Sequence, residues 1–213
     1  MPVSGRSRVR AYVGLGGNVG PVEERLVAAL EAFASLPGVR LRGVSRLYRT
    51  RPVGVVDQPA FLNAVAALDV PAGQDPASGA LAFLMTLKEL ERALGRRPGP
   101  RWGPRAVDLD LLLFGRHRLQ VERPPAARSA DPTRPPQLVV PHPQAQQRLF
   151  VLAPWADLAP RLVPPGWGET VATARHRREL VEGVDAVVPV GRWDPEVGRW
   201  RSFNGGRGGG DAA

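Results

Sequence analysis

The sequence predicts a single mixed α/β domain in which strands pack with helices around one core. The chain has 213 residues, enough for a core of ordinary size, and its length gives no reason to expect two full domains. Hydrophobic residues make up 43% and charged residues 23%, the composition of a soluble globular protein. Segments with strand-like alternation and segments with helical spacing follow one another along the chain, so both kinds of element are expected.

The first strand is expected at residues 8–15, where apolar and polar residues alternate, and the glycine-rich stretch 14–20 follows it. A helix should begin at Pro21 and end at Pro37. A glycine turn between a strand and a helix can bind phosphate, but Val19 stands where a dinucleotide fingerprint requires glycine, and no Gly-Lys-Ser/Thr sequence occurs. The glycines are therefore interpreted as a tight turn from strand to helix.

Two further strands are expected at residues 39–49 and 61–69, joined by a loop too long for a tight hairpin. Phe61 and Asn63 are two residues apart and should share one face of the second of these strands. An aromatic ring beside a side-chain amide can stack on a flat heterocycle and read it by hydrogen bonds. The alternative is that Phe61 belongs to the core and Asn63 to a turn.

The clearest helix is expected at residues 76–94, where leucines recur at helical spacing and Gly95 ends the element. Lys88 and Glu91 lie three residues apart and share a face of this helix. An arginine loop rich in glycine and proline follows at residues 95–101. It could approach an anion and close over it, or it could be an unstructured basic connector.

Asp108 and Asp110 are the strongest candidates for a functional site. They lie two apart in the apolar strand expected after Pro104, so both side chains should face the same way. Two adjacent carboxylates repel each other and need a cation, and Mg²⁺ prefers carboxylate oxygen. Beside Arg101 and Arg105, the pair indicates a site that holds a polyphosphate. The alternative is that the two aspartates only form ion pairs with these arginines.

Short elements and irregular chain alternate in the next segment. Residues 118–121 should pair back on the preceding strand as a hairpin, and the proline-rich stretch 122–136 should be an exposed insertion. Residues 138–143 should be extended and hold His142 between two prolines. This imidazole could donate to a phosphate or simply lie on the surface; zinc is not expected, because the other two histidines lack ligand spacing to it.

The last third of the chain should contain two helices, at residues 144–153 and 169–181, with irregular chain at 155–165 between them. From Arg192 onward the sequence is rich in glycine and arginine, and we expect disorder.

The charge balance favours an anionic partner. The formal net charge is +9, carried almost entirely by arginine, whose guanidinium group binds phosphate bidentately in nucleic acids and in small polyphosphates alike. No apolar run reaches the ~20 residues needed to span a bilayer, the first residues lack the apolar core of a signal peptide, and cysteine is absent. A cytoplasmic protein without membrane contact is expected.

Several separated motifs together resemble the 6-hydroxymethyl-7,8-dihydropterin pyrophosphokinase family of folate biosynthesis. They extend over about residues 9–165 and occur in the family's order. The motifs are Tyr12-Val13-Gly14-Leu15-Gly16-Gly17-Asn18, Tyr48-Arg49-Thr50 with Pro52-Val53-Gly54, Asp57-Gln58-Pro59, Phe61-Leu62-Asn63-Ala64, Arg101-Trp102-Gly103-Pro104-Arg105 with Asp108-Leu109-Asp110, and Val140-Pro141-His142-Pro143 with Arg148 and Phe150.

The resemblance implies a ferredoxin-like fold, an antiparallel sheet with helices packed on one face. It also implies transfer of pyrophosphate from ATP to the hydroxymethyl group of the dihydropterin, leaving AMP. Two Mg²⁺ ions would be bound by Asp108 and Asp110, and Arg96 and Arg105 would join these aspartates in catalysis. The resemblance assigns to ATP the residues Glu91, Arg96, Trp102, Arg105, Leu111, Leu138, Val139, His142 and Arg148. It assigns to the pterin Thr50, Val53, Gly54, Phe61, Asn63, Trp102, Asp108 and Phe150.

On this pattern, residues 8–165 form the pyrophosphokinase domain, 166–191 a C-terminal extension with one helix, and 192–213 a disordered tail. Pro98 stands where the family often has a second loop arginine, which Arg97 would replace. The extension and the insertion are expected to leave the chemistry unchanged, and the protein is expected to act as a monomer.

Two other functions fit parts of the sequence. An RNA-recognition module would suit a ferredoxin-like sheet and the positive charge, but the sequence lacks its Lys/Arg-Gly-Phe/Tyr runs, so nucleic acid is not the expected partner. A magnesium-dependent hydrolase could use the aspartate pair on a phosphate ester. Formation of AMP only in the presence of the reduced pterin would separate the pyrophosphokinase from both.

Overall fold

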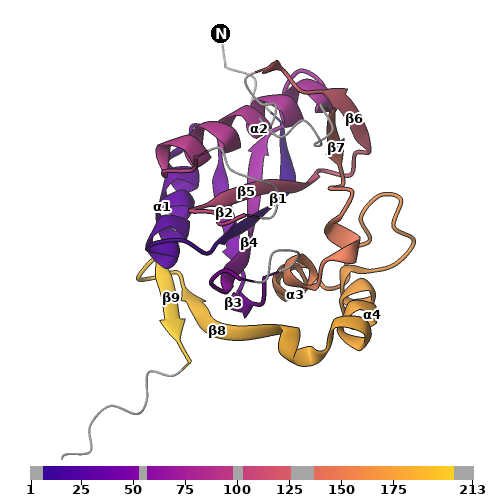
Figure 1. Cartoon of the computed structure of the whole chain (residues 1–213). Coiled ribbons are helices and arrows are strands. Elements are labelled where there is room, and N and C mark those ends of the chain that lie inside the picture. Colours follow the sequence, from indigo (N-terminus) through magenta and orange to yellow (C-terminus); the bar gives the residue numbers. More distant parts are fainter. Residues whose placement is uncertain (1–6, 53–56, 98–102, 126–136, 204–213) are drawn as a thin grey trace, which may run out of the picture.

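The computed structural model describes residues 7–52, 57–97, 103–125 and 137–203. Its centre is a seven-stranded antiparallel sheet in the order β5-β1-β4-β3-β8-β9, with β2 also paired to β4 (Figure 1). A separate two-stranded sheet joins β6 and β7. The strands are β1 (Arg8–Gly17), β2 (Arg40–Val44), β3 (Leu47–Thr50), β4 (Phe61–Pro71), β5 (Asp108–Phe114), β6 (Leu119–Glu122), β7 (Gln137–Val140), β8 (Val187–Asp194) and β9 (Arg199–Ser202).

Four α-helices cover the two faces of the main sheet: α1 (Val22–Ser35), α2 (Pro76–Ala93), α3 (Leu149–Leu158) and α4 (Val171–Glu182). The helices α1 and α2 pack on one face, and α3 lies against the other, with α4 beside it (Figure 1). The middle of β4 is therefore buried on both sides, from Asn63 to Leu68. The family resemblance implied helices on one face only, and α3 covers the second face. Within the described residues no helix has the length and apolar character needed to cross a bilayer.

The helix α2 shows why the local sequence forms its element. Asp75 caps the first turn by accepting hydrogen bonds from the backbone N–H groups of Ala77 and Ser78, and Pro76 occupies the first turn, where no N–H is required. Gly95 follows the helix with a φ of +89°, a conformation that glycine adopts without strain. These signals explain why the helix matches the predicted residues 76–94 within one residue.

The strand expected at residues 39–49 is two strands, because Ser45 interrupts it. The Ser45 hydroxyl accepts a hydrogen bond from the Val65 backbone N–H at 2.9 Å and donates one to the Arg46 carbonyl at 2.7 Å. A side chain thus replaces one backbone partner, and the chain turns from β2 into β3. Nothing local in the sequence reveals this long-range contact.

The expected hairpin at residues 118–121 is also wrong in its partner. β6 pairs with β7, not with β5, in the register Leu119↔Val140 to Glu122↔Gln137. Likewise, α3 continues to Leu158 despite Pro154, because Trp155 is fully buried and packs on the rings of Tyr12 and Trp167 at 5.5 and 5.4 Å. Tertiary packing overrides the break that the proline indicated.

The expectation of disorder from Arg192 is wrong for the described residues as far as 203. The strand β8 pairs with β3, and β9 pairs with β8. Trp193 and Trp200 pack edge to face with ring centroids 4.9 Å apart, and Trp200 is buried and donates from Nε1 to the Ser45 carbonyl at 2.9 Å. Two tryptophans supply the apolar contacts that the glycine- and arginine-rich composition concealed.

Candidate active site

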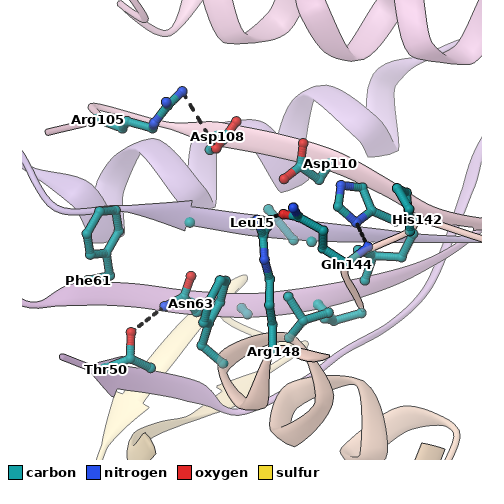
Figure 2. A pocket seen from close by; sticks show the side chains of 18 of the residues that line it. Leu15, Thr50, Phe61, Asn63, Arg105, Asp108, Asp110, His142, Gln144 and Arg148 are labelled. Carbon is teal, nitrogen blue, oxygen red and sulfur yellow. Dashed lines mark hydrogen bonds and ion pairs between the residues drawn. The ribbon is translucent and has the colours of Figure 1, made fainter. Parts of the chain in front are cut away.

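A cavity of about 440 Å³ lies between the main sheet and α3. Its walls come from β1, β3, β4, β5, β7 and α3, so most of the motifs singled out in the sequence meet there (Figure 2). Among the predicted site residues, those that line the cavity are Thr50, Phe61, Asn63, Arg105, Asp108, Asp110, Val139, His142, Arg148 and Phe150.

The aspartate pair occupies one end of the cavity. Asp108 and Asp110 both line it, whereas Leu109 between them is fully buried on the opposite side of β5. Each aspartate stands opposite a glycine of β1, in the pairs Gly16↔Asp108 and Gly14↔Asp110. The two-residue spacing therefore has the geometric result expected from the sequence, with both carboxylates directed to one space.

The glycines of β1 form the floor of the cavity. They were predicted to form a strand-to-helix turn, but β1 continues through Gly17, so Gly14 and Gly16 lie within the strand. A Cβ on Gly16 would lie 2.7 Å from Oδ1 of Asn63, which is closer than real contacts allow. Glycine is needed here because it leaves room for the amide of the neighbouring strand.

The helix α2 closes the open edge of β5 between the two aspartates. Leu109 lies on an edge strand, and its backbone groups are satisfied by side chains: its N–H donates to Glu91 at 2.7 Å and its carbonyl accepts from Lys88 at 3.0 Å. Lys88 and Glu91 also pair with each other at 2.7 Å. This Lys88–Glu91 clamp fixes the backbone that carries Asp108 and Asp110.

Arg96 links Glu91 of the clamp to Asp108 of the cavity wall. Its guanidinium group donates to Glu91 at 2.5 Å and forms an ion pair with Asp108. The Glu91 side chain is only 3% exposed, and burial raises its pKa to about 7, aided by the charge of Asp108 and opposed by Lys88 and Arg96. Glu91 and Arg96 thus act on the site through Asp108 and Leu109, and neither lines the cavity wall in this conformation.

The donor set at this end fits a hard divalent cation. Asp108 and Asp110 offer carboxylate oxygens on one face, and the guanidinium group beside Asp108 already shows that this carboxylate attracts positive charge. Across the described part of the chain, no group of three or more His, Asp or Glu side chains could hold a metal by itself. Mg²⁺ is often bound in this way, by one or two carboxylates together with substrate phosphates and water.

A planar polar group is presented at the other end. Asn63 is buried in β4 and donates from Nδ2 to the Thr50 hydroxyl at 2.8 Å, which fixes the orientation of its amide. Phe61 is half-buried and lines the cavity, as does Phe150 from α3. The alternative in which Phe61 is core and Asn63 belongs to a turn does not hold.

His142 stands beside Asp110 at the mouth of the cavity. Its backbone N–H donates to the Leu112 carbonyl at 2.9 Å, which ties the end of β7 to β5. Its Nδ1 accepts from the Gln144 backbone N–H at 3.3 Å, so Nε2 carries the proton of the neutral ring. Burial lowers the pKa of His142, and Arg148 adds to this effect while Asp110 opposes it.

Some predicted residues are placed differently. Leu111 and Leu138 have fully buried side chains in the core and do not line the cavity. Val53, Gly54 and Trp102 lie outside the described residues.

The other lining residues were not predicted as site residues, and they include Gly14, Gly16, Arg51, Leu112, Arg123, Gln137 and Gln144. The two glycines could not be predicted because the sequence does not reveal that they lie opposite the aspartates on the neighbouring strand.

Asn18 is a positioning residue that the sequence analysis quoted only as part of a motif. It is 5% exposed, and its amide donates to Gln58 at 3.0 Å and to the Pro59 carbonyl at 3.1 Å. Its Oδ1 accepts from the Arg105 backbone N–H at 2.8 Å. One side chain therefore holds together the end of β1, the loop before Phe61 and the segment before β5.

The fold and the site define a class of protein: a single-domain α/β enzyme whose cavity joins carboxylates that fit a divalent cation to guanidinium groups that fit a phosphate. The model of the 7,8-dihydro-6-hydroxymethylpterin-pyrophosphokinase (HPPK) family matches residues 12–160. The chain belongs to this family.

Relatives are found in several bacteria. A 2-amino-4-hydroxy-6-hydroxymethyldihydropteridine pyrophosphokinase of Pseudomonas aeruginosa is 44% identical over 173 residues, covering 81% of this chain and 90% of that protein. A protein of the same name from Synechocystis sp. is 37% identical over 182 residues, covering 84% and 80%. One from Bacillus subtilis is 38% identical over 148 residues, covering 70% and 77%.

Solved structures share the fold. A crystal structure of an HPPK-DHPS in complex with substrates matches with a TM-score of 0.69 at 12% identity, covering 92% of this chain and 49% of that one. A Plasmodium falciparum HPPK-DHPS triple mutant matches with a TM-score of 0.67 at 13% identity, covering 92% and 48%. The chain therefore spans about half the length of these larger proteins, and the likeness concerns the fold alone.

Proposed function

We propose that this protein transfers pyrophosphate from ATP to the hydroxymethyl group of 6-hydroxymethyl-7,8-dihydropterin, releasing AMP, as a step of folate biosynthesis. One observation carries the proposal: a single cavity has paired carboxylates at one end and a buried amide with two phenylalanines at the other. The first end suits a metal-bound triphosphate, and the second suits a flat heterocycle.

The pterin occupies the end formed by β3, β4 and α3. Phe61 and Phe150 stack on its ring, and Asn63, oriented by Thr50, reads its polar edge by hydrogen bonds. Val53, Gly54 and Trp102 complete this end on the family's pattern. Asp108 lies at the junction of the two ends, next to the hydroxyl that accepts the pyrophosphoryl group.

ATP occupies the end formed by β5, β7 and the first turn of α3. Arg105, Arg148 and the Nε2–H of His142 bind phosphate oxygens, and Arg96 adds its charge after leaving Asp108. Glu91 supports this end from behind β5, and Trp102 completes it on the family's pattern. Val139 contacts the nucleoside through its side chain, and Leu111 and Leu138 contact it through their backbone.

Asp108 and Asp110 would hold two Mg²⁺ ions, which would neutralise charge on the triphosphate. The hydroxymethyl oxygen attacks the β-phosphorus, and the bond from that phosphorus to the α–β bridging oxygen breaks. AMP departs with that oxygen, and the hydroxyl proton is released to solvent. The chain supplies alignment and positive charge, and no covalent intermediate is needed.

The fold favours this reaction over RNA binding. In an RNA-recognition module an open sheet face stacks the bases. Here α3 and the cavity residues occupy the face opposite α1 and α2. The protein acts as a monomer, and its need for ATP fits a cytoplasmic location.

The test is to incubate the protein with ATP, Mg²⁺ and the dihydropterin alcohol and to separate the nucleotides. AMP should form in a one-to-one ratio with pterin diphosphate, and only when the pterin is present. ADP or free phosphate as the nucleotide-derived product, or AMP formation without the pterin, would contradict the proposal and favour a hydrolase.

A further inference from the structure

The C-terminal segment after residue 160 lies beyond the family-model match, yet it packs on β3 and α3, two elements that carry residues of the cavity wall. The ordered C-terminal extension is longer than the 166–191 expected from the sequence: residues 161–203 comprise α4, β8 and β9. Its far end is anchored by Trp200, which is buried in the main core and bonded to the Ser45 carbonyl. The extension is therefore packed on the domain along its length.

The first contact with the cavity runs through backbone pairing. The strand β8 pairs with β3, and in this register Val187 stands opposite Thr50. Thr50 is the residue whose hydroxyl orients the Asn63 amide at 2.8 Å. The strand that carries Thr50 would be an edge strand without β8, so the extension fixes the position of its backbone.

The second contact is a small apolar cluster directly behind Phe150. Val187 is buried there together with Tyr48, Leu149 and Ala153, and Phe150 packs against the cluster. The neighbouring Val188 points the other way and is 45% exposed. Val187 is thus the buried side chain that the extension contributes to the cluster on which Phe150 packs, and Ala186 packs against the same cluster.

The third contact is polar and reaches the first turn of α3. Glu182 of α4 accepts a hydrogen bond from the Leu149 backbone N–H at 3.4 Å and is held by Arg178 at 2.6 Å. The first N–H groups of a helix have no partner within the helix, and negative charge there is favourable. The turn fixed in this way carries Arg148 and Phe150, which both line the cavity and which the proposed function assigns to ATP and to the pterin respectively.

We infer that the C-terminal extension is a positioning element of the substrate cavity: Val187 sets the place of Phe150 and Thr50, and Glu182 sets the first turn of α3. This inference rests on the proposed function, because the residues it positions are those assigned to the pterin and to ATP. It differs from the expectation that the extension leaves the chemistry unchanged.

The test compares two matched pairs of variants by steady-state kinetics with both substrates. Val187→Ala should raise KM for the dihydropterin roughly three- to tenfold, with KM for ATP and kcat within about twofold of wild type. Val188→Ala makes the same chemical change one residue away on the exposed face and should leave all three constants unchanged. Val187→Ile, which keeps the buried methyl groups, should restore KM for the pterin.

The second pair separates the polar contact from the loss of an ion pair. Glu182→Ala removes the contact to Leu149 and should raise KM for both substrates roughly threefold, because the turn carries residues of both ends. Glu179→Ala loses an equivalent i,i+4 ion pair, to Arg175 at 2.7 Å, without touching α3, and should behave as wild type.

The outcomes are distinct. A lower fraction of folded protein reduces the apparent kcat but not KM, so a selective rise in KM is not explained by instability alone. If Val187→Ala and Glu182→Ala keep wild-type KM values, or if their controls show the same rise, the inference is wrong. A wild-type protein that forms no AMP contradicts the proposed function instead.

Discussion

Asp110 differs from Asp108 in its surroundings, although both line the same cavity. Asp108 forms an ion pair with Arg96 and precedes Leu109, whose backbone is held by the Lys88–Glu91 clamp. Asp110 instead faces His142. The two carboxylates of the site therefore have different neighbours, a guanidinium group at Asp108 and an imidazole at Asp110. Asp110 is the cleaner place to test the metal assignment, because its loss leaves the Arg96 contact in place.

Asp110→Ala should lower kcat at least about 100-fold, because the phosphate charge would then lack one of its metal ligands. The fold should be unaffected, since Asp110 is half-exposed and faces the cavity. Turnover and circular dichroism should be measured on the same sample, and isothermal titration should show weaker Mg²⁺–ATP binding. Turnover at the wild-type level would remove Asp110 from the metal site.

Gly16→Ala should selectively weaken pterin binding. The new methyl group would lie 2.7 Å from Oδ1 of Asn63, so the amide must move away from the position that Thr50 gives it. KM for the pterin should rise roughly tenfold, consistent with a disturbed buried hydrogen bond. Gly14→Ala is the matched comparison: its methyl group meets Leu112 at an ordinary 3.5 Å, and its effect should be clearly smaller. Equal effects from the two would argue against steric displacement of Asn63.

At the scale of the element, β5 and α2 act as one unit. Lys88 and Glu91 satisfy both backbone groups of Leu109, in place of a neighbouring strand. The position of the aspartates therefore depends on a helix whose side chains never reach the cavity wall. The sequence indicated only that Lys88 and Glu91 share a helix face.

Lys88→Met should lower both stability and turnover. It leaves the buried Leu109 carbonyl without its partner and Glu91 without one of its two cations, which should cost about 1–3 kcal/mol. Chemical denaturation measures the stability. The effect on β5 is measured as kcat at a temperature where both proteins are folded, and kcat of the variant should be below that of wild type. Arg92→Met, also a cation of α2 but exposed, is the control. If Lys88→Met loses stability but keeps wild-type kcat, the clamp does not position the aspartates.

The sequence predicts elements well where the signal is local. The capping residues of α2 and the two-residue spacing of Asp108 with Asp110, and of Phe61 with Asn63, each lead to the observed placement. It fails where a distant partner decides, as at Ser45, whose hydroxyl bonds Val65 and divides a strand. It also fails at β8 and β9, where pairing with β3 and two tryptophans packed edge to face order a segment whose end is rich in glycine and arginine.

For the site, the residue types and faces were predictable, but the supporting contacts were not. The pattern of period two is a property of the strand itself, so it survives any tertiary arrangement. The contacts of Asn18 with Pro59 and Arg105, or of Glu91 with Leu109, join segments far apart in the chain. Spacing along the sequence carries no information about such pairs.

At the scale of the whole molecule, a buried polar network joins the sheet to α3. Asp157 accepts hydrogen bonds from the Tyr48 hydroxyl at 3.0 Å and from Arg46 at 2.5 Å. Burial raises the pKa of Tyr48 well above its usual value of 10, with the charge of Asp157 adding to the effect and Arg46 and Arg175 opposing it. The folded protein therefore keeps this phenol protonated.

This network predicts how stability depends on pH. Below pH 10 Tyr48 is protonated in the folded and in the unfolded state, and its contribution to the free energy of unfolding is fully present. As the pH rises further, Tyr48 ionises first in the unfolded chain. The free energy of unfolding therefore falls by up to about 1.4 kcal/mol per pH unit. Tyr48→Phe should cost about 1–2 kcal/mol at pH 8 and should show a shallower loss between pH 10 and 11. Urea titrations of both proteins across this range are the measurement, and parallel curves would contradict the assignment.

The position of β9 has a consequence for behaviour in concentrated solution. Since β8 and β9 extend the sheet beyond β3, the outermost strand on that side is Arg-Trp-Arg-Ser, whose two arginines are exposed, and not Leu-Tyr-Arg-Thr. Unpaired strand edges recruit other chains, and charged side chains on an edge discourage this. The C-terminal strands therefore place Arg199 and Arg201, in place of Leu47 and Tyr48, at this edge of the described sheet, and we expect this to disfavour edge-to-edge association.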